Sequence, residues 1–180
     1  TGEGGRAQYV SKAELRKARS YFGLVFQNFN LFPHYSVLKN VIDAPMNVQK
    51  RGKGEAVAKA RELLAKMGLE DKANSYPYQL SGGMRQRVVI AIAAACRPQI
   101  LICDEPTTAL DVTIQAQILQ LIRDLQKELG MSVIYITHDQ SEALVLSDHV
   151  AVMNHGRFEQ VGTPQALYYQ PQTPFVAGFV

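Results

Sequence analysis

The sequence lacks tryptophan, has only two cysteines and contains no long apolar run. Its longest apolar segment, Val88–Cys96, lies between Arg87 and Arg97, whereas a helix needs about 20 apolar residues to cross a bilayer. This difference argues against a transmembrane helix. Cys96 and Cys103 match no metal-binding or redox spacing, so we expect small buried thiols in a reducing compartment.

The sequence also has little excess charge of either sign. Its 180 residues include 19 Lys and Arg and 16 Asp and Glu, which gives a formal net charge of +3. An excess this small, spread along the chain, gives no reason to expect a nucleic-acid partner, and we expect none. Hydrophobic residues make up 47% of the chain, which is typical of a globular protein long enough to bury one substantial core.

Apolar segments typical of strands alternate with segments typical of helices. The expected strands are residues 21–26, 100–103, 132–137, 150–153 and 158–161, the last two forming a hairpin. The expected helices are residues 11–19, 37–48, 54–67, 84–96, 112–129 and 140–146, with a last short one beginning at Pro164. Continuously apolar strands separated by helices indicate an α/β fold with a largely parallel sheet covered by helices.

Two adjacent carboxylates, Asp104 and Glu105, come directly after the expected strand at 100–103. In open α/β sheets, ligands bind beyond the carboxyl ends of the strands. A carboxylate in that place can hold Mg²⁺ on a nucleotide, and a second one can accept a proton from an attacking water. By itself the pattern is weak, because solvated acids at the end of a strand are more common than a site.

A second motif places a hydroxyl and two glycines at the start of the helix expected near residue 84. The segment Leu80–Arg87 reads LSGGMRQR. The N-terminus of a helix attracts anions, and glycines allow a phosphate to approach closely; the alternative is that Ser81 is an ordinary N-cap. The octet resembles the signature motif of ABC ATPases, and it precedes Asp104 and Glu105 in the order that this family requires.

Three more segments resemble motifs of the same family, in the same order. Phe26 and Gln27 end a strand and resemble the Q-loop, and residues 108–111 resemble the D-loop. His138 ends a later strand and resembles the switch histidine. Each has a simpler alternative: Gln27 as a loop residue, Asp111 as the N-cap of the next helix, and His138 as a polar strand end. Together, the five motifs make the chain similar to the ATP-binding subunit of an ABC transporter.

The resemblance implies a role for each residue of the expected hydrolysis site. Glu105 would be the general base for the attacking water, and Asp104 would stabilise Mg²⁺. Gln27 would sense the metal and the water beside the membrane subunits. His138 would contact the γ-phosphate of ATP. Catalysis at such sites consists mainly of positioning and of stabilising charge on a loose phosphoryl transition state.

The resemblance also implies partners. These ATPases work as head-to-tail dimers, so Ser81, Gly82 and Gly83 would close over ATP bound by a second, identical or related, ATPase subunit. Asp111 would help to couple the two sites. Permease subunits in the membrane would receive the motion, and a solute-binding protein would deliver the solute. The chain would then lie at the cytoplasmic face of the cell membrane as a peripheral subunit.

The family fold implies a P-loop NTPase core at residues 1–33 and 98–180, with a helical subdomain at about 34–97. Yet no G-x-x-x-x-G-K-[ST] phosphate-binding loop occurs in the sequence. We therefore expect that Thr1 is not the natural start, and that residues 1–180 alone bind Mg-ATP poorly and hydrolyse little.

The subfamily resemblance changes along the chain. Residues 21–87 are similar to importers of polar amino acids, 104–130 to importers of dipeptides and oligopeptides, and those from His138 onward to importers of polyamines and sugars. We expect an importer of an amino acid or another small polar solute. Two alternatives remain open: a partner subunit that supplies only the signature motif without hydrolysing ATP, and a soluble ABC ATPase of DNA maintenance.

Overall fold

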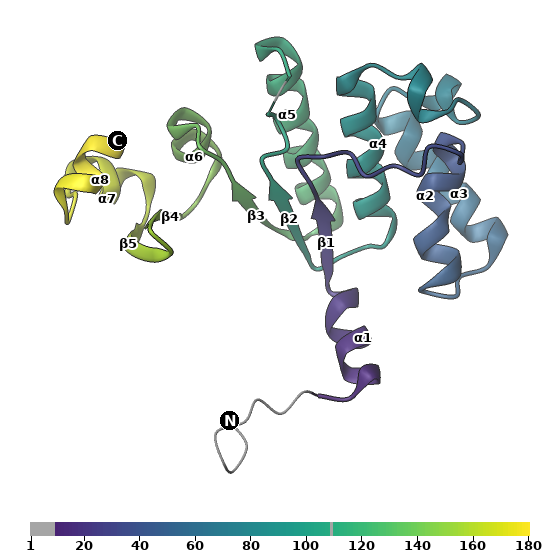
Figure 1. Cartoon of the computed structure of the whole chain (residues 1–180), viewed down its shortest axis with the longest axis horizontal. Coiled ribbons are helices and arrows are strands. Elements are labelled where there is room, and N and C mark those ends of the chain that lie inside the picture. The colour runs from purple at the N-terminus through teal and green to yellow at the C-terminus, as the bar shows by residue number, and fades with distance from the viewer. Residues whose placement is uncertain (1–9, 109) are drawn as a thin grey trace. The chain divides into compact units, whose positions relative to one another are not determined.

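The computed structural model describes residues 10–108 and 110–180. Residues 1–9 of the predicted core and Ala109 of the D-loop-like segment lie outside the described residues. The chain forms two compact units, residues 1–134 and 135–180 (Figure 1). Among the residues that the structure describes, none of the helices has both the length and the apolar character needed to cross a bilayer.

The first unit contains the strands that lead to the predicted carboxylates. It begins with α1 (Lys12–Ser20) and β1 (Phe22–Val25). A helical stretch follows, made of α2 (Val37–Asn47), α3 (Lys53–Lys66), the 3₁₀ turns η1 (Glu70–Lys72) and η2 (Pro77–Gln79), and α4 (Gly82–Ala95). The chain then forms β2 (Ile100–Asp104), α5 (Val112–Leu129) and β3 (Ser132–Ile136), which crosses into the second unit.

The sheet has the predicted parallel arrangement. Strands β1 and β2 are parallel neighbours, with Phe22 opposite Ile100 and Val25 opposite Cys103, and the order of the sheet is β1-β2-β3. Because neighbouring parallel strands end at the same edge of a sheet, the residues that follow β1 and β2 come close together. The prediction of an α/β fold with a parallel sheet is confirmed.

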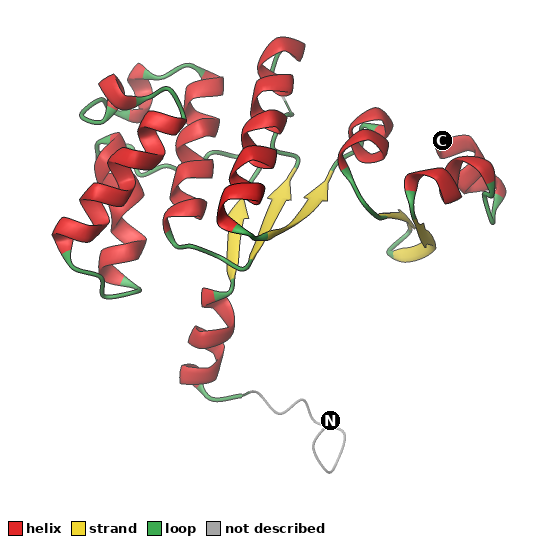
Figure 2. Cartoon of the chain, turned by 180° about the vertical axis from the view of Figure 1, so that it is seen from behind, coloured by secondary structure: helices red, strands yellow, loops and turns green. Residues whose placement is uncertain are grey.

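The two faces of β1 and β2 differ in burial. Val25, Leu101 and Cys103 are fully buried, and α4 packs against both β1 and α5. Helix α5 passes in front of the strands in Figure 2. Side chains of β1 on the opposite face stay open, with Phe22 43% and Leu24 47% exposed. The sheet core of the first unit therefore lies on the side of α4 and α5.

The helical stretch between β1 and β2 has a core of its own. Helices α2, α3 and α4 pack against one another, and their fully buried side chains include Val41, Leu63, Leu64 and Ile90. Pro45 lies inside α2, which continues to Asn47. The division into a core and a helical subdomain at 34–97 stays a prediction.

Local signals fix several helix ends. A capping box begins α1: Ser11 Oγ accepts from the Glu14 amide, and the Glu14 carboxylate accepts from the Ser11 amide. Gly130 ends α5 in the left-handed conformation, at φ +63°. Helix α4 begins at Gly82, earlier than the predicted Met84, because Ser81 caps it.

The second unit is a hairpin flanked by short helices. After β3 come α6 (Gln140–Leu146), β4 (Val150–Asn154), β5 (Arg157–Gly162), α7 (Pro164–Tyr169) and α8 (Pro174–Phe179). Strands β4 and β5 pair antiparallel, as predicted. The predicted helix beginning at Pro164 is confirmed as α7, but it is not the last one, because α8 follows it. The same Thr-Pro pair begins both helices, with Thr163 and Thr173 as the N-caps.

Candidate active site

The two predicted carboxylates stand at the carboxyl end of β2. Asp104 is the last residue of the strand and is exposed, and Glu105 follows it half-buried. Glu105 has a φ of +46°, in the left-handed region that residues with a Cβ seldom adopt. A backbone in such a region costs about 1–3 kcal/mol. Asn30, Lys50, Arg97 and His155 also adopt it, so the conformation alone does not mark a site. The chain therefore turns sharply just where the predicted base lies.

Two side chains donate hydrogen bonds to one oxygen of Glu105. Gln27 Nε2 lies 3.1 Å from Glu105 Oε2, and Thr108 Oγ1 lies 3.0 Å from the same oxygen. Gln27 comes shortly after Val25, the last residue of β1, so the two parallel strands bring Gln27 and Glu105 together. These bonds orient the carboxylate. The structure thus assembles three of the predicted site residues, Gln27, Asp104 and Glu105, at one edge of the sheet.

Thr108 is a site residue that the sequence analysis missed, because it appeared there only as part of the D-loop-like segment. A tight turn places it, since the Thr108 amide donates to the Glu105 carbonyl at 3.2 Å. The sequence signal that could have identified Thr108 was a hydroxyl three residues after a carboxylate, because a single turn can bring side chains at this spacing together.

The signature-like motif forms the first turn of α4. Ser81 Oγ accepts from the Met84 amide at 3.3 Å, so the N-cap alternative for Ser81 is correct. Ser81 and Gly82 are exposed, and Gly83 is half-buried. The first amides of α4 have no partner within their own helix, and the helix dipole favours an anion beside them. The geometry is compatible with the predicted contact to ATP of another subunit, which stays a prediction.

Asp111 also serves as a cap. Its Oδ1 accepts from the Ile114 amide at 3.0 Å and starts α5. Next to it, Leu110 lies beside the signature motif: a Cβ built on Gly82 would be 3.6 Å from Leu110 Cδ2, an ordinary contact distance. The D-loop-like segment and the signature-like motif of one chain are therefore neighbours. The predicted coupling role of Asp111 stays a prediction.

His138 lies in the second unit, where it follows β3 and is exposed. Its neighbours in the sequence are well ordered by hydrogen bonds. Thr137 Oγ1 donates to Glu142 Oε2 at 2.9 Å, and Asp139 Oδ1 accepts from the Glu142 amide at 3.0 Å as the N-cap of α6. The predicted contact between His138 and a γ-phosphate stays a prediction.

The donor set at the end of β2 fits Mg²⁺ only as part of a nucleotide complex. Asp104, Glu105 and the amide oxygen of Gln27 are hard oxygen donors, which Mg²⁺ prefers. However, the described residues contain no cluster of three or more His, Cys, Asp or Glu that could hold a metal ion. Mg²⁺ usually keeps several waters and binds one or two carboxylates together with phosphate oxygens. The predicted role of Asp104 in stabilising Mg²⁺ stays a prediction.

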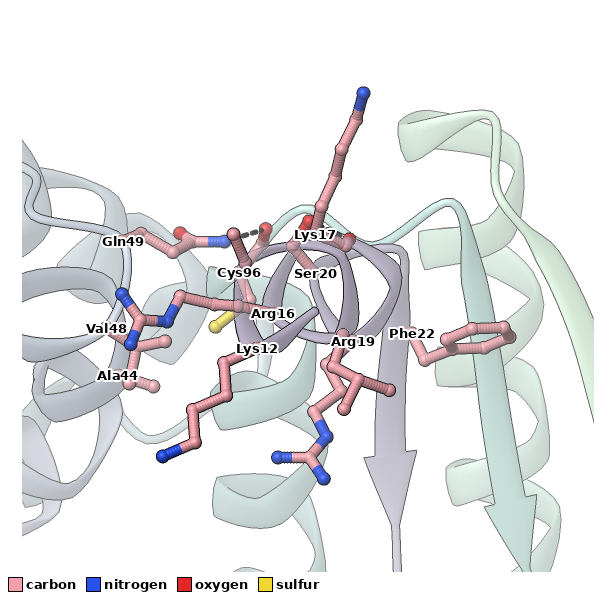
Figure 3. Close-up of a pocket in the computed structure, with 12 residues that line it drawn as sticks. Lys12, Arg16, Lys17, Arg19, Ser20, Phe22, Ala44, Val48, Gln49 and Cys96 are labelled. Atoms are coloured by element: carbon pink, nitrogen blue, oxygen red, sulfur yellow. Dashed lines mark hydrogen bonds between the residues drawn. The ribbon is translucent and has the colours of Figure 1, made fainter. Parts of the chain in front are cut away.

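A pocket of about 840 Å³ lies at the other end of the same strands. Phe22, the first residue of β1, and Cys96, which precedes β2, are part of its wall (Figure 3). Arg16 of α1 extends toward Val48, the residue that follows α2, and Gln49 Nε2 donates to the Cys96 carbonyl at 2.8 Å. The carboxylates stand at the opposite ends of the strands, so this pocket is separate from the candidate active site.

Neither cysteine is suited to be a nucleophile. Burial raises the pKa of the Cys103 thiol to about 12, and burial also raises the pKa of Cys96, against a smaller opposing effect of Arg51. Both thiols stay protonated near neutral pH. Cys103 is buried as expected, whereas Cys96 is only half-buried.

Known proteins share this chain's sequence over nearly its whole length. The ABC transporter family model matches residues 3–108. The L-cystine transport system ATP-binding protein TcyN of Escherichia coli (strain K12) is 45% identical over 97% of this chain and 70% of its own length. The arginine transport ATP-binding protein ArgV of Corynebacterium glutamicum is 42% identical over 91% of this chain and 64% of its own length. The Fe(3+) ions import ATP-binding protein FbpC 2 of Rhizobium meliloti is 42% identical over 93% of this chain, which corresponds to 42% of the relative's own length.

The chain belongs to the ABC transporter family, as an ATP-binding subunit of the importer type. This membership confirms the family that the five motifs predicted, and the family is one of ATPases. The chain spans between 42% and 70% of the length of these three relatives.

Proposed function

We propose that this chain is part of a subunit that hydrolyses ATP to drive import of a small polar solute across the cytoplasmic membrane. The observation that carries the proposal is the hydrogen bond from Gln27 Nε2 to Glu105 Oε2. It joins a residue predicted to sense metal and water to the predicted base, across two neighbouring strands. Hydrolysis needs such a juxtaposition, because phosphoryl transfer depends chiefly on positioning.

Each residue of the strand-end group has a distinct part in the proposed reaction. Glu105 accepts a proton from the water that attacks the terminal phosphorus, and Gln27 and Thr108 hold its carboxylate in the required direction. Asp104 supplies an oxygen ligand for Mg²⁺. When bound, the ion supplies positive charge that offsets the charge developing on the phosphate oxygens. His138 adds a contact to the γ-phosphate.

The proposed subunit functions in a dimer. Ser81, Gly82 and Gly83 face a nucleotide held by the opposite ATPase subunit, and Asp111 links the two sites. Permease subunits receive the closing and opening motion, and a solute-binding protein presents the solute at the other side of the membrane. We place the subunit at the cytoplasmic face of that membrane.

An amino acid is the proposed solute class. The support is indirect, because it comes from the names of similar proteins, which include ATP-binding proteins for the transport of L-cystine and arginine. Relatives named for import of Fe(3+) ions and sulfate share nearly as much sequence. Uptake of radiolabelled amino acids, sulfate and Fe³⁺ by cells with and without the gene would decide among them.

The test of the proposed hydrolysis is Glu105→Gln in the assembled transporter. The variant keeps the size of the side chain and the acceptor for Gln27 but removes the base, so steady-state hydrolysis should fall by a factor of about 10² to 10⁴. ATP binding should be retained. Glu70→Gln, at an exposed acid of η1, is the matched control and should hydrolyse ATP like the parent. A parent protein that binds ATP but hydrolyses none would instead support the non-hydrolysing partner.

A further inference from the structure

Gly83 is the tightest point between the signature-like motif and the next long helix. A Cβ built on Gly83 would lie 2.7 Å from Ile114 Cγ2, closer than carbon atoms approach without displacement. Gly82 differs, since its Cβ would meet Leu110 Cδ2 at an ordinary 3.6 Å. Of the two adjacent glycines, only Gly83 is therefore required by packing inside its own chain.

Ile114 cannot easily move away from Gly83. It is a β-branched residue in the first turn of α5, and such side chains are restricted to one strongly preferred χ1 rotamer in a helix. Its backbone is also held, because its amide donates to Asp111 Oδ1 at 3.0 Å. Cγ2 is bonded directly to Cβ. With the χ1 rotamer fixed, Cγ2 can move away from Gly83 only if the backbone of α5 moves.

A second contact ties α4 to α5 one turn further on. Arg87 Nη2 donates to Gln117 Oε1 at 2.5 Å, while Arg87 Nη1 lies 3.4 Å from the Met67 carbonyl at the end of α3. On the other side, Gln115 Nε2 donates to the Thr107 carbonyl at 3.3 Å. The first two turns of α5 thus contact both the turn that carries the predicted base and the helix that carries the signature-like motif.

We propose that Ile114 is a positioning residue that sets where the signature-like motif lies relative to Glu105 of the same chain, through its close contact with Gly83. This inference rests on the proposed function, in which the two groups serve different ATP molecules of one dimer. A displacement of the Glu105 turn when ATP is hydrolysed in one site would then reach, through Asp111 and Ile114, the motif that closes the other site.

The test is a set of double-mutant cycles in the full subunit assembled with its partners. Gly83→Ala should lower ATP-driven dimerisation and hydrolysis about tenfold, because the added methyl group forces α4 away from α5. Adding Ile114→Ala removes Cγ2 and should restore both activities to within about threefold of the Ile114→Ala variant alone. Adding Ile114→Val keeps Cγ2 and should restore nothing.

Gly82→Ala is the matched control, since it changes the same motif without touching Ile114. Its effect should simply add to that of Ile114→Ala. A positioning role also predicts that ATP affinity of the undimerised Gly83→Ala subunit is unchanged. If Gly83→Ala is equally defective with and without Ile114→Ala, or not defective at all, the proposal is wrong.

The free energy of unfolding of the same variants is also measured in urea without nucleotide. This measurement separates failure of the proposed function from failure of the positioning role. If the parent protein hydrolyses no ATP, the proposed function fails, while coupling between Gly83 and Ile114 in unfolding still reports the contact. If the parent is active and no rescue occurs, only the positioning role of Ile114 is lost.

Discussion

The end of β2 and the start of α4 carry the two candidate functional groups of the first unit, and they are built on different physical grounds. At the end of β2, polar atoms make the site: Gln27 and Thr108 both donate to Glu105. At the start of α4, backbone amides and glycines make the site, and Gly83 packs against Ile114. The first group is therefore sensitive to a change of functional group, and the second to a change of volume.

The largest change in ATP turnover that tests this comparison is expected when both hydrogen-bond donors to Glu105 are removed. Gln27→Leu combined with Thr108→Val should lower turnover about 100-fold, because a misoriented base costs about that much. Folding stability should change by no more than about 0.5 kcal/mol, because all three side chains lie at the surface or half-buried. ATP hydrolysis and urea unfolding measure the two quantities.

Thr108→Ser is the control for that pair, because it keeps the hydroxyl and should keep most of the turnover. A Gln27→Leu/Thr108→Val protein with the parent's turnover would mean that the hydrogen bonds to Glu105 have no part in the reaction.

A smaller effect is expected at the caps. Ser81→Ala removes the cap of α4, and Asp111→Ala removes the cap of α5; each should lower the free energy of unfolding by about 1 kcal/mol. Ser81→Gly and Asp111→Asn should cost only a few tenths of a kcal/mol. Urea unfolding of the four variants measures the difference. Equal stabilities within each pair would show that these side chains do not cap their helices in solution.

The smallest effect concerns the thiol just behind the carboxylates. Burial raises the pKa of Cys103 from an ordinary value of 9.0 to about 12. The unfolded thiol therefore loses its proton first, and between these two pH values Cys103 lowers the free energy of unfolding as pH rises. At pH 8 the native thiol should react with a disulfide reagent far more slowly than the unfolded one. A native Cys103 that reacts at the unfolded rate would contradict its burial.

Much of this molecule follows from local sequence signals. The helices expected at residues 11–19 and 112–129 end close to where predicted, because Ser11 with Glu14 caps one start and Gly130 caps the other end, and capping depends on a few adjacent residues. The carboxylates after β2 and the glutamine after β1 could be paired in advance, because parallel strands end at one edge. Two of the simpler alternatives, that Ser81 and Asp111 are N-caps, are correct.

What the sequence could not predict depends on distances between separate elements. No pattern reveals that Gly83 meets Ile114 or that Arg87 bonds to Gln117, because the packing of α4 on α5 decides both. Thr108 was missed because its role depends on the left-handed turn at Glu105. Helix α8 was missed although its Thr-Pro start was visible.

The most direct test of the central claim, that the two groups act on different ATP molecules, uses dimers of two differently mutated subunits. One dimer pairs a Glu105→Gln subunit with a Ser81→Arg subunit, and the other pairs a subunit carrying both changes with an unchanged one. Head-to-tail sharing predicts one intact site, and measurable hydrolysis, only in the first dimer. Equal hydrolysis by the two dimers, or hydrolysis by the second alone, would contradict it.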